Sequence, residues 1–427
     1  MQTLDSPGCT GYWTSIDVDS QGYVHIVYRD ETDNQLVHIC QDGGGWQSEV
    51  VDACDCWFIS MALDSEDQPR ISYYEHTEGG IRYVYRDGSD WVTECVEPLS
   101  YTPGRYPRTD IELADDGTPH IVWYETDDLD LRYAVRTGGA WTLETVESSG
   151  DTGKNPSLSL DSSGNPHVAY WSPTGDAVRY AERVGGEWEV QTLAVNVWPN
   201  TTSYNTIVLD SQDRPHIAYN LSQMADGSIR YAWHDGSDWN TEVVIDWMYG
   251  YPGTPSGIVL DESGYPHISV NYNGMGYAIG SCCKDGSGWN YEFIQEQGCD
   301  DAVCIDGDGH LHMSYFDIAE EDLIYAYRGE EAVETDARHS VSGEISVDVL
   351  PNPCSSPCFA RIRLDSPSWV TLEVYDASGR MVSEADRQLL QRGEHVLSLG
   401  EFPAGVYLCR VRTPEVRAVA EFVSLGR

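Results

Sequence analysis

The chain has 427 residues, with 70 acidic against 25 basic side chains and a formal net charge of −45. This balance excludes nucleic acid and anionic membrane surfaces as expected partners, because both are bound through clustered Lys and Arg. The 41% apolar share, with 27 Tyr and 14 Trp, excludes a disordered chain, and without a run of about 18 apolar residues we expect no membrane span.

A repeated unit fills residues 1–330. Its most regular position is a histidine within an apolar segment, replaced once by arginine, and its seven members lie 45 to 51 residues apart: His25, Arg70, His120, His167, His216, His267 and His312. The apolar residues of each unit alternate with a period of two, which is typical of strands, and no stretch keeps the 3.6-residue period of a helix.

The fourth unit shows the internal order of the repeat. An apolar strand ends at Asp161, a tight turn contains Gly164, two further strands follow with Tyr180 on the second of them, and the last strand opens with Trp188. A single four-stranded sheet would leave both faces wet, whereas units stacked radially bury both faces against their neighbours. The sequence therefore predicts an all-β fold that begins with a seven-bladed β-propeller.

The two ends of the repeat region predict how the ring closes. The seventh unit lacks the Gly-Trp opening of a fourth strand, while residues 2–4 match the end of the fourth strand at 191–193. We therefore expect the N-terminal strand to complete blade seven, which removes an exposed sheet edge. Residues 331–335 are the alternative occupant of that place.

The recurrent residues predict structure rather than chemistry. A histidine repeated around a ring is expected to hydrogen-bond between strands or to a neighbouring loop, and the recurrent Tyr and Trp to pack blades together. Acidic turns such as Asp306-Gly307-Asp308-Gly309 resemble calcium loops but lack the terminal bidentate Glu. We expect no metal and no cofactor, with calcium as an unsupported alternative.

The irregular connectors between blades carry the candidate binding residues. They lie on the same face as the loops between second and third strands, which add acids such as Asp127 and Asp128. The predicted ligand-binding aromatics are Tyr12, Trp13, Trp57, Phe58, Tyr101, Tyr106, Trp198, Tyr204, Trp247, Tyr249 and Tyr251. Aromatic rings beside carboxylates suit sugar rings or a peptide. The alternative is that these rings fill gaps between blades.

Motifs for catalysis are missing from the sequence. There is no Gly-x-Ser-x-Gly elbow, no His-Glu-x-x-His and no complete phosphate loop, since residues 150–155 have the wrong spacing. No catalytic residue is predicted. The expected function is non-catalytic binding of an extracellular glycan or protein. One alternative is a polysaccharide-cleaving lyase or hydrolase, because the many Asp and Glu residues neither identify nor exclude a catalytic carboxylate pair. The other is a structural surface or adhesion component.

Twelve cysteines favour an oxidising compartment over a cytosol. Cys354 and Cys358 flank a turn and are predicted to form a disulfide. Cys9 and Cys299 occupy equivalent loops of blades one and seven, which ring closure makes neighbours, and they form the second candidate pair. No Cys-x-x-Cys spacing occurs, so the cysteines do not predict a metal site.

A second pattern begins after a linker predicted at 331–344. Residues 345–427 carry nine basic and ten acidic side chains, so this part is nearly neutral. Its alternating segments and turns predict a small immunoglobulin-like β-sandwich of about 80 residues.

Several pieces of this second pattern resemble a known family. They are Pro351-Asn352-Pro353, the segment VYDASG at 374–379, Gly393 and the segment PAGVY at 403–407. Together they resemble the C-terminal sorting domains of the type IX secretion system and the related domain of flagellar hook-capping proteins. The resemblance implies export through the secretion machinery, then release or attachment at the outer cell surface. The chain departs from this family in lacking its lysine-rich close. The residues that follow Met1 do not form a signal-peptide pattern, so we expect the sequence to be that of the mature protein, after removal of its signal peptide.

Overall fold

A computed structural model describes the chain apart from short gaps. The described residues are 1–6, 8–100, 107–195, 203–223, 226–248, 253–272, 278–286, 288–328, 345–350, 358–364, 368–376, 381–390, 392–400, 402–403, 405–412 and 417–424. Within these ranges all regular structure is β, in 35 strands. Contacts divide the chain into two units, Met1–Ala332 and Val333–Arg427, which are described separately.

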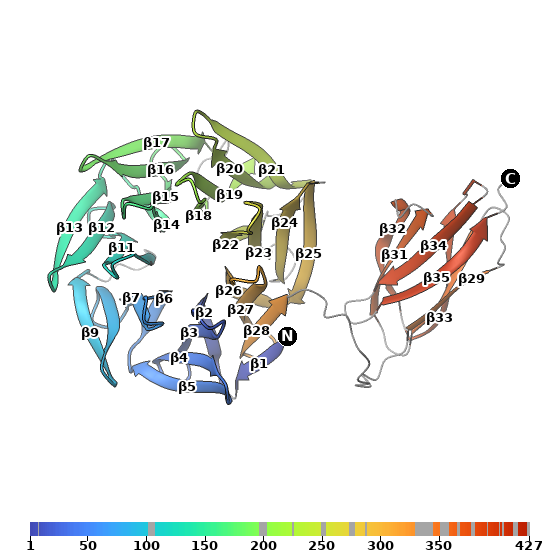
Figure 1. The fold of residues 1–427 in the computed structure, drawn as a ribbon, viewed down its shortest axis with the longest axis horizontal. Coiled ribbons are helices and arrows are strands. Elements are labelled where there is room, and N and C mark those ends of the chain that lie inside the picture. Colours follow the sequence, from blue (N-terminus) through green and yellow to red (C-terminus); the bar gives the residue numbers. More distant parts are fainter. Residues whose placement is uncertain are drawn as a thin grey trace. The chain divides into compact units, whose positions relative to one another are not determined.

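The first unit is a ring of seven four-stranded antiparallel sheets (Figure 1), which confirms the predicted propeller. The first strand of each blade lies innermost and the fourth lies outermost. The strands, from blade one to blade seven, are β2 (Thr10–Val18), β3 (Val24–Asp30), β4 (Gln35–Asp42), β5 (Gly45–Asp52); β6 (Cys56–Leu63), β7 (Pro69–Glu75), β8 (Ile81–Asp87), β9 (Asp90–Glu97); β10 (Thr109–Leu113), β11 (Pro119–Tyr124), β12 (Leu131–Thr137), β13 (Ala140–Glu147); β14 (Lys154–Leu160), β15 (Pro166–Ser172), β16 (Ala177–Val184), β17 (Glu187–Val195); β18 (Asn205–Leu209), β19 (Pro215–Gln223), β20 (Asp226–His234), β21 (Trp239–Met248); β22 (Thr254–Leu260), β23 (Pro266–Tyr272), β24 (Ala278–Asp285), β25 (Gly288–Glu296); and β26 (Gly298–Ile305), β27 (Leu311–Asp317), β28 (Asp322–Arg328), with β1 (Gln2–Asp5) as the last.

The ring closes through the N-terminal strand. β1 pairs antiparallel with β28, so that Gln2 lies opposite Tyr325 in the register. Blade one also holds this strand, because the Trp46 indole donates to Gln2 Oε1 at 3.3 Å and the Tyr28 hydroxyl donates to Asp5 at 2.5 Å. The predicted closure is confirmed. The alternative segment, 331–335, lies outside the described residues.

Acidic side chains on outer strands join neighbouring blades. Glu94 in β9 accepts two hydrogen bonds from Arg136, at 2.9 and 2.7 Å, and one from the Trp141 indole at 3.0 Å. Glu144 receives Arg183 and Trp188 in the same way across the next joint. The recurrent tryptophan was predicted to pack between blades, and the structure shows that its indole also hydrogen-bonds across the joint.

The inner strands are joined by a second recurring contact, which the sequence analysis did not anticipate. A small polar side chain on the first strand of one blade accepts a backbone N–H from the first strand of the next. The pairs are Ser15 with Met61 at 3.1 Å, Ser60 with Ile111 at 3.3 Å, Asp110 with Leu158 at 2.8 Å and Ser157 with Ile207 at 3.2 Å. These bonds satisfy inner-edge backbone groups that would otherwise be unpaired.

The histidine column is structural in most blades. His120 Nδ1 lies 2.6 Å from the Tyr133 hydroxyl, and His167 Nδ1 lies 2.5 Å from that of Tyr180. In blade two, Arg70 donates from Nε to Asp64 at 2.9 Å. Burial lowers the pKa of His120 to about 4, so this imidazole is neutral at pH 7. These contacts link the second strand to the third strand or to the preceding turn, as predicted.

Turn chemistry accounts for the recurrent aspartates. Asp210 Oδ1 accepts the backbone N–H groups of Gln212 and Arg214 at 2.8 and 3.0 Å. Burial raises the pKa of Asp210, but the Arg214 side chain and these backbone donors outweigh it and bring the pKa to about 2. The same carboxylate-to-backbone pattern occurs at Asp306, where Oδ1 accepts from Asp308 and His310. These carboxylates therefore stabilise the turns.

Two glycines of equal backbone conformation provide a matched test of blade packing. Gly153 and Gly186 both have φ +95°, but a Cβ on Gly153 would lie 2.7 Å from Leu131 Cα of the preceding blade, whereas one on Gly186 would meet nothing within 4 Å. We expect Gly186→Ala to cost about 1 kcal/mol, the strain of a left-handed alanine. We expect Gly153→Ala to cost about 3 kcal/mol or more, because blade four must also move away. Denaturant unfolding of both variants measures this, and equal losses would contradict the packing.

The second unit is a two-layer β-sandwich, as predicted. One sheet contains β29 (Ile345–Leu350), β30 (Cys358–Leu364) and β33 (Gly393–Gly400), and the other contains β32 (Met381–Leu390), β31 (Ser368–Asp376), β34 (Gly405–Arg412) and β35 (Arg417–Ser424). One core includes side chains from both sheets, among them Ile362 and Leu372. This four-plus-three layout is immunoglobulin-like.

Two predictions for this region fall outside what the structure describes. The linker 331–344 lies among the omitted residues. Cys354 is also omitted, and the side chain of Cys358 in β30 is not described, so their disulfide stays a prediction.

Candidate ligand-binding pocket on the propeller axis

A pocket of about 350 Å³ lies where the first strands of all seven blades meet. These strands are the innermost of each sheet (Figure 1). A pocket that all seven of them line therefore lies on the propeller axis. Its lining residues are Trp13, Thr14, Ser15, Phe58, Ile59, Ser60, Arg108, Thr109, Asp110, Asn155, Pro156, Ser157, Tyr204, Asn205, Thr206, Thr254, Pro255, Ser256, Asn271, Cys299, Asp300, Asp301 and Ala302.

Bulges in the inner strands direct side chains into the pocket. The register of β2 shifts between Tyr12 and Ser15, and the register of β26 shifts between Cys299 and Ala302. Residues inside such shifts have left-handed backbone conformations: Trp13 at φ 49°, Phe58 at 56°, Asn155 at 50° and Asp300 at 52°. A bulge re-aims a side chain, and left-handed backbone at a non-glycine residue is strained. Four blades therefore place a strained residue in the pocket wall.

Arg108 lies between aromatic rings of two other blades. Its guanidinium carbon lies 4.8 Å from the ring centroid of Phe58 and 5.0 Å from that of Tyr204. Trp13 continues the wall, with its ring 5.2 Å from Phe58. Burial raises the pKa of Asp300, and the nearby guanidinium of Arg108 partly offsets this. The pocket thus combines aromatic faces, one cation and a buried carboxyl.

Three buried oxygens of the pocket have no partner among the residues that the structure describes. They are Oδ1 of Asn205, Oδ1 of Asn271 and Oδ1 of Asp301. The other side-chain atom of Asn205 donates to the backbone oxygen of Asn155 at 2.7 Å, and Asp301 Oδ2 accepts from Ser256 at 2.5 Å. A buried acceptor without a donor costs about 1–3 kcal/mol. A ligand that supplies donors would satisfy all three.

Acidic side chains follow on the same inner strands. Asp110 in β10 accepts from Ser60 Oγ at 2.6 Å. Burial raises the pKa of Glu112, in the same strand, to about 8, and the carboxyls of Asp110 and Asp17 add to the effect. Burial also raises the pKa of Asp17. Neutral pH therefore leaves Glu112 largely protonated.

The raised pKa of Glu112 gives a prediction for stability against pH. A carboxyl whose pKa increases from 4.5 to about 8 on folding stabilises the fold at low pH, and this contribution disappears as pH rises through about 8. We expect the melting temperature to fall between pH 6 and pH 9, and Glu112→Gln to regain roughly 1–2 kcal/mol at pH 9. The exposed Glu189→Gln is the control. Identical pH profiles for wild type and Glu112→Gln would contradict the assignment.

Three of the predicted aromatics line the pocket, and two others, Tyr12 and Trp57, pack beside Trp13 without lining it. Trp13, Phe58 and Tyr204 line the pocket. Tyr12 stacks on Phe316 with ring centroids 4.0 Å apart, and Trp57 stacks on His76 at 4.5 Å. Five predicted residues lie outside the described ranges, and the side chain of a sixth, Trp247 in β21, is not described; the five are Tyr101, Tyr106, Trp198, Tyr249 and Tyr251.

The polar residues of the pocket were missed by the sequence analysis. The sequence does not single out Arg108, Asn205, Asn271, Asp300 or Asp301, because none of them belongs to an aromatic pair in a connector. The sequence does contain a signal for these residues. In each blade, the residue five positions before the last residue of the first strand lines the pocket. Its occupants are Trp13, Phe58, Arg108, Asn155, Tyr204, Pro255 and Asp300.

Cys9 and Cys299 come from blades one and seven and lie near the same tyrosine. Burial, together with Cys9, Glu31 and more weakly Cys299, raises the pKa of Tyr12. Cys9 Sγ lies 3.6 Å from Glu31 Oε2. The structure carries both cysteines as free thiols. Their disulfide stays a prediction.

The family comparison concerns the second unit. Residues 348–423 match the model of the secretion system C-terminal sorting domain. This match agrees with the resemblance seen in the sequence and shows a type IX sorting domain, so the protein is secreted or displayed on the outer cell surface. No curated protein sequence matches the chain. In the part of the chain that the structure describes, no helix has the length and apolarity to cross a membrane.

Solved structures similar to this chain are propellers of low sequence identity. An ulvan lyase of polysaccharide lyase family 25, bound to -[GlcA(1-4)Rha3S]-, has 13% identity and a TM-score of 0.50, covering 74% of this chain and 91% of its own. Hydrazine synthase of Kuenenia stuttgartiensis has 10% identity and a TM-score of 0.52, covering 77% and 97%. These similarities support the fold alone.

Proposed function

We propose that this exported propeller binds a neutral or sparsely charged extracellular glycan in the axial pocket, without catalysis. One observation carries the proposal: aromatic rings from three blades share the pocket with three buried acceptor oxygens that have no partner among the described residues. Sugar rings present apolar C–H faces and several hydroxyl donors, and this set of groups complements both features.

The pocket residues have distinct roles in this proposal. Trp13 and Tyr204 offer faces on which a sugar ring stacks. Asn205, Asn271 and Asp301 accept hydrogen bonds from its hydroxyls, and Arg108 donates to ring or hydroxyl oxygens. The volume of about 350 Å³ lies at the lower end of the usual range for ligand pockets, about 300–1,000 Å³, which suits one or two sugar units.

The charge of the protein narrows the glycan class. With a net charge of −45, the chain repels polyanions at long range. A densely sulfated or uronic polymer would therefore approach slowly, whereas a neutral polymer would not be repelled.

A glycan array probed with the full chain tests the proposal. We expect signal on neutral polysaccharides, little dependence on salt, and unchanged polysaccharide after prolonged incubation. Signal confined to polyanions, or recovery of a protein ligand from extracellular extracts with no glycan bound, would contradict it.

A polysaccharide-cleaving activity is the second candidate, and Asp301 is the observation that favours it. Burial raises the pKa of this pocket carboxyl to about 6, close to the range in which a general acid or base works. If the protein cleaves, new reducing or unsaturated ends appear during incubation and Asp301→Asn abolishes them. That result would replace non-catalytic binding while keeping the same pocket.

A further inference from the structure

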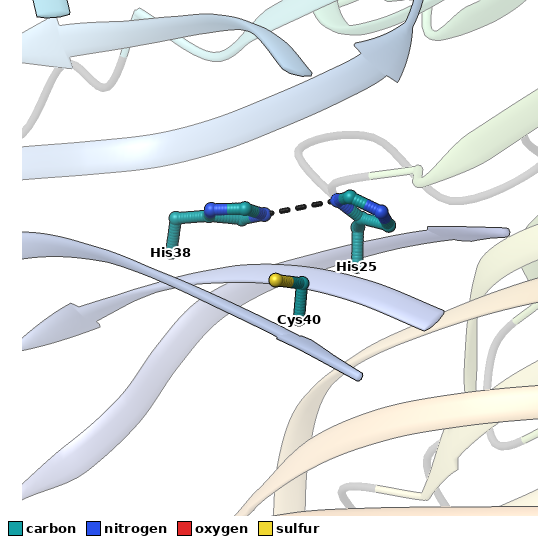
Figure 2. Close-up of side chains that lie close together, drawn as sticks. All are labelled: His25, His38 and Cys40. Carbon is teal, nitrogen blue, oxygen red and sulfur yellow. Dashed lines mark hydrogen bonds between the residues drawn. The ribbon is translucent and has the colours of Figure 1, made fainter. Parts of the chain in front are cut away.

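Blade one departs from the histidine–tyrosine pair of the repeat. In blade three, His120 lies opposite Val135 in the register and bonds the Tyr133 hydroxyl. In blade one, His25 lies opposite Cys40, and His38 takes the place of the tyrosine. Figure 2 shows the imidazole of His25, from β3, beside that of His38, with Cys40 two residues after His38 on β4.

We propose that His25, His38 and Cys40 bind a zinc ion, or another borderline transition metal, in blade one. One ligand atom from each residue lies within 4.8 Å of the others. His25 Nδ1 and His38 Nε2 lie 3.1 Å apart. Two imidazole nitrogens on one tetrahedral zinc would be about 3.3 Å apart, so the two histidines are nearly in place for a shared metal.

Carboxylates lie behind both histidines. His25 Nε2 faces Asp19 Oδ2 at 3.6 Å, and His38 Nδ1 lies 3.2 Å from Glu49 Oε1. Metal-binding histidines in proteins commonly give their remote ring nitrogen to a carboxylate, which fixes the ring and its tautomer. This arrangement leaves His25 Nδ1 and His38 Nε2 turned toward each other, as a shared metal requires.

The surroundings select the kind of ion. Two imidazoles and a thiolate favour zinc or cobalt over the oxygen-seeking calcium and magnesium. His25 and His38 are 8% and 4% exposed, whereas Cys40 is half-buried and offers the entry side. Of the two carboxylates behind the histidines, Glu49 pairs with Arg86 as well as with His38, whereas Asp19 faces His25. Water would complete the fourth position.

The proposed metal would tie the second and third strands of blade one together. The site is separate from the axial pocket, because His25 pairs with Asp17, at the end of β2 away from Trp13. The proposal therefore stands or falls independently of the glycan proposal. It also departs from the expectation, drawn from the sequence, that every histidine of the column is purely structural.

Cobalt and zinc titrations of the full, reduced and metal-stripped chain test the site. We expect one equivalent of Co²⁺ to bind with a thiolate charge-transfer band and tetrahedral d–d bands, and Zn²⁺ to displace it and raise the melting temperature. His38→Tyr restores the pair used in blade three, and Cys40→Val restores that blade's valine, so both variants should fold.

The variants separate this site from adventitious thiols. We expect His38→Tyr and Cys40→Val to weaken Zn²⁺ binding at least a hundredfold and to lose the charge-transfer band. Cys95→Ser, at an exposed cysteine in β9, should bind as wild type does. A wild-type chain without the band, an unchanged band in His38→Tyr, or its loss in Cys95→Ser would overturn the proposal.

Discussion

Replacing Arg108 with alanine is expected to weaken binding of the array-identified glycan at least thirtyfold, about 2 kcal/mol, while the fold is kept. The guanidinium lies between the rings of Phe58 and Tyr204 on the pocket wall, so the substitution removes a donor and the packing of both rings together. Trp13→Ala is expected to have a similar effect through loss of its stacking face. Titration calorimetry with an oligosaccharide of that glycan measures both.

The control for this prediction is Arg328→Ala. Arg328 is about half exposed and pairs with Glu292 at 2.9 Å on the outer strands of the propeller, away from the inner strands. It should bind as tightly as wild type. Because Trp13 also packs beside Trp57, each variant's melting curve must accompany its affinity. A folded Arg108→Ala variant that binds the glycan with wild-type affinity would show that the glycan does not bind in the axial pocket.

Deleting residues 1–5 is expected to destabilise the propeller by about 3–5 kcal/mol and to cause self-association. The deletion exposes the edge of β28, which β1 covers, and leaves the buried Tyr28 hydroxyl without Asp5. An unpaired buried hydroxyl alone costs about 1–3 kcal/mol. Thermal unfolding and sedimentation of the shortened chain test this.

A milder variant separates strand pairing from side-chain contacts in the closure. Gln2→Ala removes only the acceptor of the Trp46 indole and should cost about 1 kcal/mol without association. If the shortened chain melts like wild type and stays monomeric, another segment closes the ring, and residues 331–335 become the first to examine.

The propeller could be predicted because its information is repeated. Seven copies of one pattern report the same strand order. Radial packing is the arrangement in which both faces of each four-stranded sheet are buried against neighbouring sheets. The pocket could be predicted only in part, since its residues lie where the pattern breaks. In each of the pairs Tyr12-Trp13 and Trp57-Phe58, the second aromatic lines the pocket, and the strand bulge decides this.

The polar half of the pocket was hidden for a related reason. Asn205 and Asp301 become functional candidates only because one oxygen of each is buried without a partner in the described part of the ring, and no local pattern in the sequence reports burial across seven blades. By contrast, the departure of blade one was visible. His25 has His38 as its partner, whereas His120 in blade three has Tyr133. Treating the histidines of the column as equivalent does not register this difference.

The most direct test is an experimental structure of the full chain with an oligosaccharide from the array. We predict seven blades closed by residues 2–5, with a sugar ring on the axis against Trp13 and Tyr204. Its hydroxyls should donate to Asn205, Asn271 and Asp301. A sugar held on the outer strands, or a ring with any other number of blades, would contradict it.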